Sequence, residues 1–236
     1  MKTISSFVTR ATSVLSVCFL ALLIGGATIV HAQEIGQVGG YFMTVVPRGE
    51  FSENVTNNGY GAGGQFLIRL GPSPFLAGGD FGAIVYGSES RREPISGTNL
   101  QVRVSTSNNI FLGHFVLRAQ PRSGPIRPYL DGLIGLKHLF TTTSISDPDG
   151  GETITSDTDL SDTTLSYGFG GGLQIPLTKG REARVLLDTN VRYLRGARAA
   201  YLKKGSIREE NGLPVFDVLF SRTDVIAVQV GVTFRF

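Results

Sequence analysis

Residues 223–236, TDVIAVQVGVTFRF, decide the fold of this chain. From position 226 onward the even positions carry Ile, Val or Phe, while the odd positions from 227 carry Ala, Gln, Gly, Thr and Arg. Because successive side chains of a strand point to opposite faces, this spacing predicts a β-strand with one apolar face and one small or polar face. A single strand does not reveal which solvent meets which face, so the rest of the chain must decide.

The start of the chain points to export. Residues 1–32 contain one lysine and one arginine as their only charged side chains, then an apolar run over 14–30 and a small-residue end at Ala32. This pattern predicts a secretory signal peptide that is cleaved after Ala32. A single membrane-spanning helix is the alternative, and the Gly-Gly pair at 25–26 weakens it.

The composition after this segment excludes several protein classes. The single cysteine, Cys18, lies inside the signal segment and the chain has no tryptophan, so disulfides do not stabilise the exported part. Both charges of residues 1–32 are basic, so the 22 Lys and Arg fall to 20 against 19 Asp and Glu. This near-neutral balance does not indicate nucleic-acid binding. No long apolar run follows residue 32, so any membrane span there must consist of strands.

Eight segments alternate with period two, and their connections alternate between short and long. The predicted strands are residues 36–46, 59–70, 75–87, 109–119, 129–141, 163–177, 184–195 and 223–236. Short turns are expected at 71–74, 121–128 and 178–180, and long polar loops at 48–57, 88–107, 144–162 and 196–222. Residues 99–105 alternate again and can extend the strand that follows them. The facing of the first strand stays open, because Phe42 and Tyr41 lie on opposite faces.

The polar faces of these strands favour a membrane barrel over a soluble sandwich. A soluble sheet would turn its charged side chains to water and bury its Phe and Val rows. Here the polar faces are rich in glycine, as the interior of a narrow tube requires. The connections also alternate between short turns and long loops, as they do in outer-membrane barrels. We therefore predict that residues 33–236 form an all-β, eight-stranded, antiparallel up-and-down transmembrane barrel in an outer membrane.

The last residues carry a family resemblance. The sequence GVTFRF, with Val232, Phe234 and Phe236 at alternate positions, resembles the C-terminal signal of bacterial outer-membrane barrels, and the VRYLRG stretch at 191–196 adds to the match. The family implied is that of the small OmpA-like and OmpX-like barrels of the Gram-negative envelope, also called the porin family. This resemblance implies that barrel-assembly machinery recognises these three residues. The alternative is that they act only as lipid-facing anchors.

The interior of an eight-stranded barrel is just wide enough for side chains to fill. Charged residues opposite the apolar rows are therefore expected to form a buried polar network and not an open channel, with opposite signs paired. The expected members are Arg69, Asp80, Arg118, Asp131, Lys137, Asp188 and Arg192. A narrow porin for small solutes is the alternative function.

Two of the predicted loops contain clusters of charged residues that could bind a ligand. Residues 147–162 gather six acids and start like a calcium loop, but the full ligand spacing is absent, so a solvated surface loop without a metal or cofactor is favoured. Residues 196–222 hold Arg198, Lys203, Lys204 and Arg208, which are suited to the phosphates of lipopolysaccharide. The apolar residues of that loop are expected to extend the last two strands.

The competing class is an enzyme that modifies lipid A. Neither His114 nor His138 is followed by a nearby serine at a strand end, so no familiar catalytic arrangement is present in the sequence. We therefore expect a non-enzymatic, monomeric barrel with a structural or adhesin-like role. Its expected partners are outer-membrane lipid and a host or surface ligand at the loops.

Overall fold

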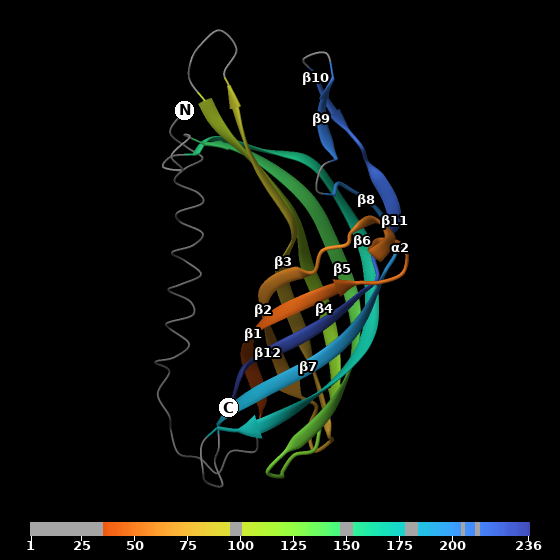
Figure 1. Ribbon diagram of the computed structural model, residues 1–236. Helices are drawn as coiled ribbons and strands as arrows, with labels where there is room; N and C mark the ends of the chain where they lie inside the picture. The colour runs from red at the N-terminus through yellow and green to blue at the C-terminus, as the bar shows by residue number, and fades with distance from the viewer. Residues whose placement is uncertain (1–34, 95–100, 147–152, 178–183, 204–205, 211–212) are drawn as a thin grey trace. The chain divides into compact units, whose positions relative to one another are not determined.

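The computed structural model describes residues 35–94, 101–146, 153–177, 184–203, 206–210 and 213–236. The expected signal peptide lies outside these residues. Eight strands form one closed antiparallel barrel in the order β1-β12-β7-β6-β5-β4-β3-β2, which confirms the predicted fold class (Figure 1). They are β1 (Gly36–Pro47), β2 (Gly59–Arg69), β3 (Phe75–Pro94), β4 (Gln101–Ala119), β5 (Arg127–Ser146), β6 (Thr153–Pro176), β7 (Val185–Gly196) and β12 (Val225–Arg235).

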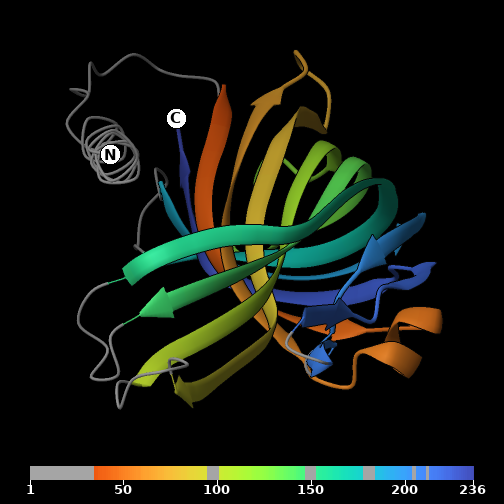
Figure 2. The same cartoon turned by 90° about the horizontal axis from the view of Figure 1, so that it is seen from above.

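The first and last strands close the barrel. β1 pairs with β12 from Gln37 opposite Arg235 to Pro47 opposite Val225, and the view from above shows β1 beside the C-terminal strand (Figure 2). We call the end with Gly36, Arg235 and the short turns the turn end, and the opposite end the loop end. No helix among the described residues is long and apolar enough to cross a membrane.

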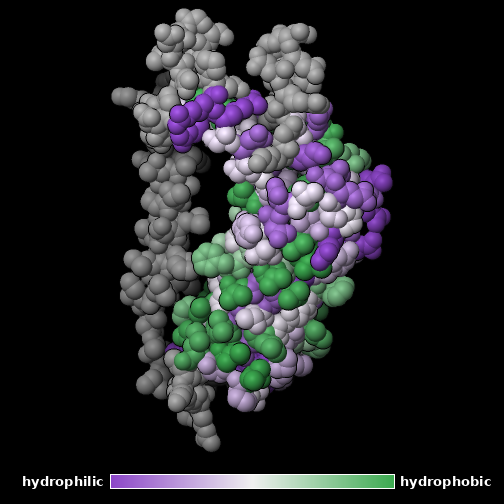
Figure 3. Space-filling view, in the orientation of Figure 1, coloured by the Kyte–Doolittle hydropathy of each residue, from purple (hydrophilic) through white to green (hydrophobic). Residues whose placement is uncertain are grey.

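The apolar rows face outward, as predicted. Phe169, Val191 and Phe234 are 69%, 53% and 40% exposed, so no second sheet covers them. Phe42 is 78% exposed and Tyr41 is buried, which settles the facing of β1. Apolar residues gather over the barrel wall toward the turn end, and hydrophilic residues lie above them (Figure 3). This outer surface suits hydrocarbon lipid.

Several glycines of the inner face are required because neighbouring backbones approach closely. A Cβ added to Gly231 of β12 would overlap the carbonyl oxygen of Gly40 and the side chain of Tyr41. On β5, a Cβ at Gly135 would meet the backbone of Gly113 and His114 in the same way. The glycine-rich polar faces therefore reflect a narrow interior, as the sequence indicated.

Two of the predicted loops are largely strand, which corrects their boundaries. β3 and β4 remain paired out to Pro94 opposite Gln101, and β5 and β6 out to Ser146 opposite Thr153. Residues 88–107 and 144–162 were predicted to be loops because they are rich in polar Ser and Thr. Strands that have left the lipid do not need an apolar row, however, and the sheet continues as a projection beyond the barrel.

The other two predicted loops also contain secondary structure. Residues 48–57 contain the short helix α2 (Glu50–Asn54). Residues 196–222 contain β8 (Arg198–Tyr201), β9 (Ile207–Glu210), β10 (Leu213–Phe216) and β11 (Leu219–Arg222), which form the pairs β8–β11 and β9–β10. The expected turn at 178–180 lies outside the described residues.

Closure of the barrel can be tested at Gly231. We expect Gly231→Val to destabilise the barrel by roughly 1–3 kcal/mol, because the larger side chain forces β12 away from β1. Urea unfolding of the protein refolded into lipid vesicles measures this loss. Gly132→Val is the matched control, since a Cβ at Gly132 would lie 3.9 Å from the nearest atom on the outer face. Equal losses in the two variants would contradict a tight seam.

Candidate functional site

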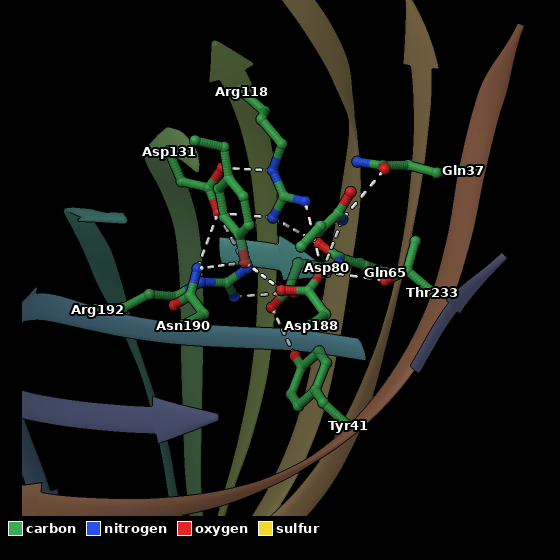
Figure 4. Close-up of polar contacts among 12 residues, drawn as sticks. Gln37, Tyr41, Gln65, Asp80, Arg118, Asp131, Asp188, Asn190, Arg192 and Thr233 are labelled. Carbon is green, nitrogen blue, oxygen red and sulfur yellow. Dashed lines mark hydrogen bonds and ion pairs between the residues drawn. The ribbon is translucent and has the colours of Figure 1, made fainter. Parts of the chain in front are cut away.

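The centre of the lumen holds a charged network contributed by four strands. Arg118 of β4 donates from Nε and Nη2 to the two carboxylate oxygens of Asp131 on β5, at 2.7 and 2.9 Å. Arg192 of β7 donates to Asp80 of β3 at 2.9 Å and to Asp131 at 3.3 Å. Asp188 of β7 lies 3.8 Å from the Arg118 guanidinium (Figure 4). These five side chains are buried.

Neutral side chains complete the network. Asp188 accepts hydrogen bonds from Gln174 at 2.8 Å, Thr233 at 3.0 Å and Gln65 at 3.3 Å. Tyr129 donates to Asp188 at 2.5 Å, and its ring lies 3.6 Å from the Arg118 guanidinium carbon. Tyr41 donates to Asp80 at 2.9 Å.

These neutral side chains were not among the residues predicted to form the interior network. They share the inward face with the charged residues, so the same alternation was the available signal. Two arginines stand against three aspartates in the network, and the amide and hydroxyl donors satisfy carboxylate oxygens that the arginines do not reach. Buried charges are tolerated when they are paired and hydrogen-bonded in this way.

Two of the seven expected members lie at other levels. Arg69 sits at the turn end, where its Nη1 is 3.5 Å from the Ser73 carbonyl oxygen. Lys137 lies nearer the loop end and donates from Nζ to the carbonyl oxygens of Leu194 and Thr223, at 3.3 and 2.5 Å. The structure therefore brings five of the seven into one cluster.

An apolar layer closes the lumen at the loop end. Phe51 of α2 is 1% exposed, and its ring lies 5.1 Å from that of Tyr201 on β8 and 5.8 Å from that of Tyr86 on β3. The Tyr86 hydroxyl donates to the Leu202 carbonyl oxygen at 3.0 Å. Buried aliphatic residues of the barrel strands, including Ile84, pack in the same cluster. This cap was not predicted, because Phe51 and Tyr201 lie in the expected loops 48–57 and 196–222 and only Tyr86 and Ile84 lie in a predicted strand.

The remaining space in the network is small. A cavity of about 10 Å³ lies among Tyr41, Tyr129 and Asp188, enough for about one water molecule. The charged network and the apolar cap lie at successive levels inside the barrel, and little free space is left among these three side chains of the network.

The histidines differ from the sequence reading in one respect. His114 Nε2 lies 2.9 Å from Ser166 Oγ, although 52 residues separate them, because glycine at position 135 of the intervening strand leaves room. His114 is 3% exposed and Ser166 is 0% exposed, so this pair is enclosed in the lumen. His138 faces outward, with Nδ1 at 2.8 Å from Thr163 Oγ1.

The acidic loop is only partly described. Residues 147–152, where the calcium-like sequence begins, lie outside the described residues. Asp159 accepts a hydrogen bond from Thr143 at 2.6 Å, and Asp162 accepts one from the Ala200 backbone at 2.7 Å. Within the described part of the chain, no group of three or more His, Cys, Asp or Glu side chains is placed to hold a metal ion.

The closed ring, the lipid-suited exterior and the packed polar interior identify the fold. The chain folds as a small, closed eight-stranded β-barrel of the outer-membrane type. No protein-family model and no curated protein sequence matches it.

Similar solved structures include three surface or outer-membrane proteins. Neisserial surface protein A is 13% identical, with 87% of this chain and 98% of that one covered and a TM-score of 0.40. Ail, the attachment invasion locus protein of Yersinia pestis in complex with the heparin analogue sucrose octasulfate, is 16% identical, with 86% and 97% covered and a TM-score of 0.40. A major outer membrane protein of Thermus thermophilus is 12% identical, with 84% and 99% covered and a TM-score of 0.44.

The network can be tested at Arg118. We expect Arg118→Met to lower the free energy of unfolding by about 3–5 kcal/mol, because Asp131 loses both of its bonds to this guanidinium. Urea titration in vesicles measures the change. Arg122→Met removes the same charge from an exposed turn, and its effect should stay within about 0.5 kcal/mol. The double variant Arg118→Met/Asp131→Leu should recover part of the loss, and no recovery would count against pairing as the cause.

Proposed function

We propose that this protein is a non-conducting, non-enzymatic barrel that presents a projecting four-stranded sheet to partners outside the cell. The observation that carries this proposal is the unequal length of the strands. β3, β4, β5 and β6 have 19 to 24 residues, whereas β1, β2, β7 and β12 have 11 or 12. Among the eight barrel strands, these four continue past the closed ring (Figure 1).

The projecting sheet has one edge at β3 and one at β6. The β6 edge is bonded near the barrel, where the Ala197 amide donates to the Leu165 carbonyl oxygen at 2.9 Å and the Ala200 amide to Asp162 at 2.7 Å. The last pair of β3 with β2 is Val85 with Tyr60, and the last pair of β6 with β7 is Ser166 with Gly196. Within the described residues, the far ends of β3 and β6 therefore each have one side without a paired barrel strand. Unpaired backbone groups of an edge strand can bind an extended segment of another protein. This supports an adhesin-like role of the outer surface.

The enclosed lumen supports the remaining parts of the proposal. A packed interior is suited to holding the sheet rigidly and leaves no path for solutes among the described side chains, so we do not propose small-solute permeation. The His114–Ser166 pair is enclosed, so an external lipid does not reach it without opening the barrel.

The projecting sheet can be removed while the barrel is kept. Gly87 pairs with Asn108, and Thr142 pairs with Thr158, so a two-residue Asn-Gly turn can close each hairpin there. We expect cells that display this trimmed barrel to lose adherence to a surface coated with extracellular-matrix proteins. The control lacks residues 207–216 instead. The Asp217 amide donates to the Ser206 carbonyl oxygen at 2.8 Å, so the two residues that flank this deletion are already close enough to be joined. Undiminished adherence of the trimmed barrel would overturn the proposal.

We also propose how the protein reaches and occupies its membrane. Residues 1–32 act as a cleaved export signal, and the barrel is a monomer in contact with lipid and lipopolysaccharide. The barrel-assembly machinery reads Val232, Phe234 and Phe236 on the outer face of β12. Phe234 and Phe236 are 40% and 46% exposed there, which supports this role.

Phe236 also has a structural role, which a substitution can separate from recognition. Its carbonyl oxygen accepts hydrogen bonds from the amides of Ile35 and Gly36, and its ring stacks on Phe66 with centroids 6.1 Å apart. Phe236→Ala keeps the backbone bonds and loses the ring. We expect it to reduce the amount of folded barrel in cell membranes, measured by heat-modifiable gel mobility. Phe66→Ala removes the same stacking from the other side, and an equal reduction there would leave only the anchor role.

A further inference from the structure

The hairpin of β7 and β12 continues beyond the barrel as a second, shorter ribbon. β8 pairs with β11, with Arg198 opposite Arg222 and Ala200 opposite Phe220. Ala199 and Tyr201 are buried beneath the ribbon, whereas Phe220 is 64% exposed. The outer face of this ribbon therefore extends the lipid-facing surface of β7 and β12 toward the loop end.

Three arginines lie where the apolar surface of this hairpin ends. Arg195 follows Val191 and Tyr193 on the outer face of β7, and Arg198 and Arg222 come next on the ribbon. Like charges directly opposite each other in a sheet are unfavourable unless an anion lies between them. The pair Arg198 and Arg222 has this arrangement.

The nearby carboxylates neutralise these arginines only in part. Glu50 lies 4.0 Å from the Arg198 guanidinium, and its Oε2 accepts a hydrogen bond from the Arg222 backbone amide at 3.1 Å, so it does not bind the Arg222 guanidinium through this bond. Asp224 lies 4.0 Å from Arg195, and both ion-pair distances are at the long limit. Asp224 also accepts hydrogen bonds from the Tyr193 hydroxyl at 3.1 Å and the Gly196 amide at 3.0 Å. The side chains of Arg195 and Arg198 are 45% and 61% exposed.

An exposed apolar pair lies beyond the arginines on the same connection. Phe220 is 64% exposed and Val218 is 51% exposed, on the side of Arg222 that leads away from the membrane strand. From the barrel outward, the surface thus changes from aliphatic to cationic and then to aromatic. This order matches an amphiphile that carries acyl chains, then phosphate, then sugar rings.

We propose that Arg195, Arg198, Phe220 and Arg222, here called the rim ribbon, bind a phosphorylated glycolipid of the outer leaflet. Acyl chains lie along Val191 and Val228 of the barrel wall. A phosphate group sits between Arg198 and Arg222, where planar guanidinium groups make paired, charge-assisted hydrogen bonds. A sugar ring packs on Phe220. The proposal rests on the outer-leaflet location given under Proposed function and concerns a surface other than the projecting sheet.

The opposite wall of the barrel carries uncharged polar residues, and not arginines, where its apolar surface ends toward the loop end. The outer faces of β4, β5 and β6 carry Asn109, His138 and Thr163, which are polar without the charge of arginine. Arg92 and Arg103 also stand opposite each other, but they lie farther along β3 and β4, beyond the bulge between Val85 and Gly87. They provide a matched pair of arginines away from the apolar wall.

The test uses the full barrel in nanodiscs of phosphatidylcholine, with bis-phosphorylated lipid A as the probe and native mass spectrometry as the readout. We expect Arg198→Gln/Arg222→Gln to weaken lipid A binding about tenfold or more, because the phosphate loses both guanidinium partners. Arg92→Gln/Arg103→Gln should bind within about twofold of the original chain, since these charges lie away from the proposed site. Heat-modifiable mobility confirms that both variants are folded.

Further probes distinguish the chemistry of the ligand. Dephosphorylated lipid A should bind weakly to every variant, and phosphatidylglycerol should bind less tightly than lipid A, with Phe220→Ala reducing that preference. An equal loss in both arginine pairs, or equal binding of dephosphorylated lipid A, would overturn the site. Equal binding of phosphatidylglycerol would overturn the glycolipid assignment. The trimmed barrel keeps the rim ribbon and should still bind lipid A, so failure of this proposal is distinguishable from failure of the adhesion proposal.

Discussion

The structure depends on the closure of the barrel by β1 and β12. Lipid offers no hydrogen-bond partner, so every backbone group within the membrane must be paired inside the protein. The eleven residue pairs from Gln37 with Arg235 to Pro47 with Val225 meet this requirement at the one seam that joins the two ends of the described chain. Beyond the lipid the requirement no longer applies. The same sheet then leaves its edges open at β3 and β6, and those edges are the basis of the proposed role.

Closure with eight strands also determines how the interior is filled. The large inward side chains lie across glycines of adjacent strands: Tyr41 across Gly63, and Tyr129 across Gly172. The glycines make room for rings and guanidinium groups that a narrow tube would otherwise exclude. The charged network and the glycine pattern are therefore two aspects of one packing arrangement. Inward side chains of opposite walls meet across the interior as a result, as Arg192 of β7 and Asp80 of β3 do.

Alternation along the chain was sufficient to predict the eight strands and the direction of their outer faces. It could not give the register between strands, which decides which inward residues reach the same level. For this reason Arg69 and Lys137 were grouped with charges from which they are separated, and the proximity of His114 to Ser166 was missed. Of the strand ends beyond the membrane, the alternation at 99–105 predicted the early start of β4 at Gln101, and the others were not predicted. The segments there are rich in serine and threonine and have no apolar row. A polar segment of this kind is interpreted from sequence as a loop.

The two surfaces at the loop end follow from the difference between long and short strands. On the side of β3 to β6, the strands remain paired as a sheet beyond the membrane and carry polar side chains far from the lipid. This arrangement suits contact with another protein. On the side of β7 and β12, the strands end at the membrane boundary, and the chain turns into a ribbon that places Arg198 and Arg222 at that level. A protein partner requires a surface that extends away from the membrane, whereas a lipid phosphate requires cationic side chains next to the lipid-facing wall. One barrel meets both requirements because closure fixes the strand number within the lipid and leaves the length of each strand outside it unconstrained.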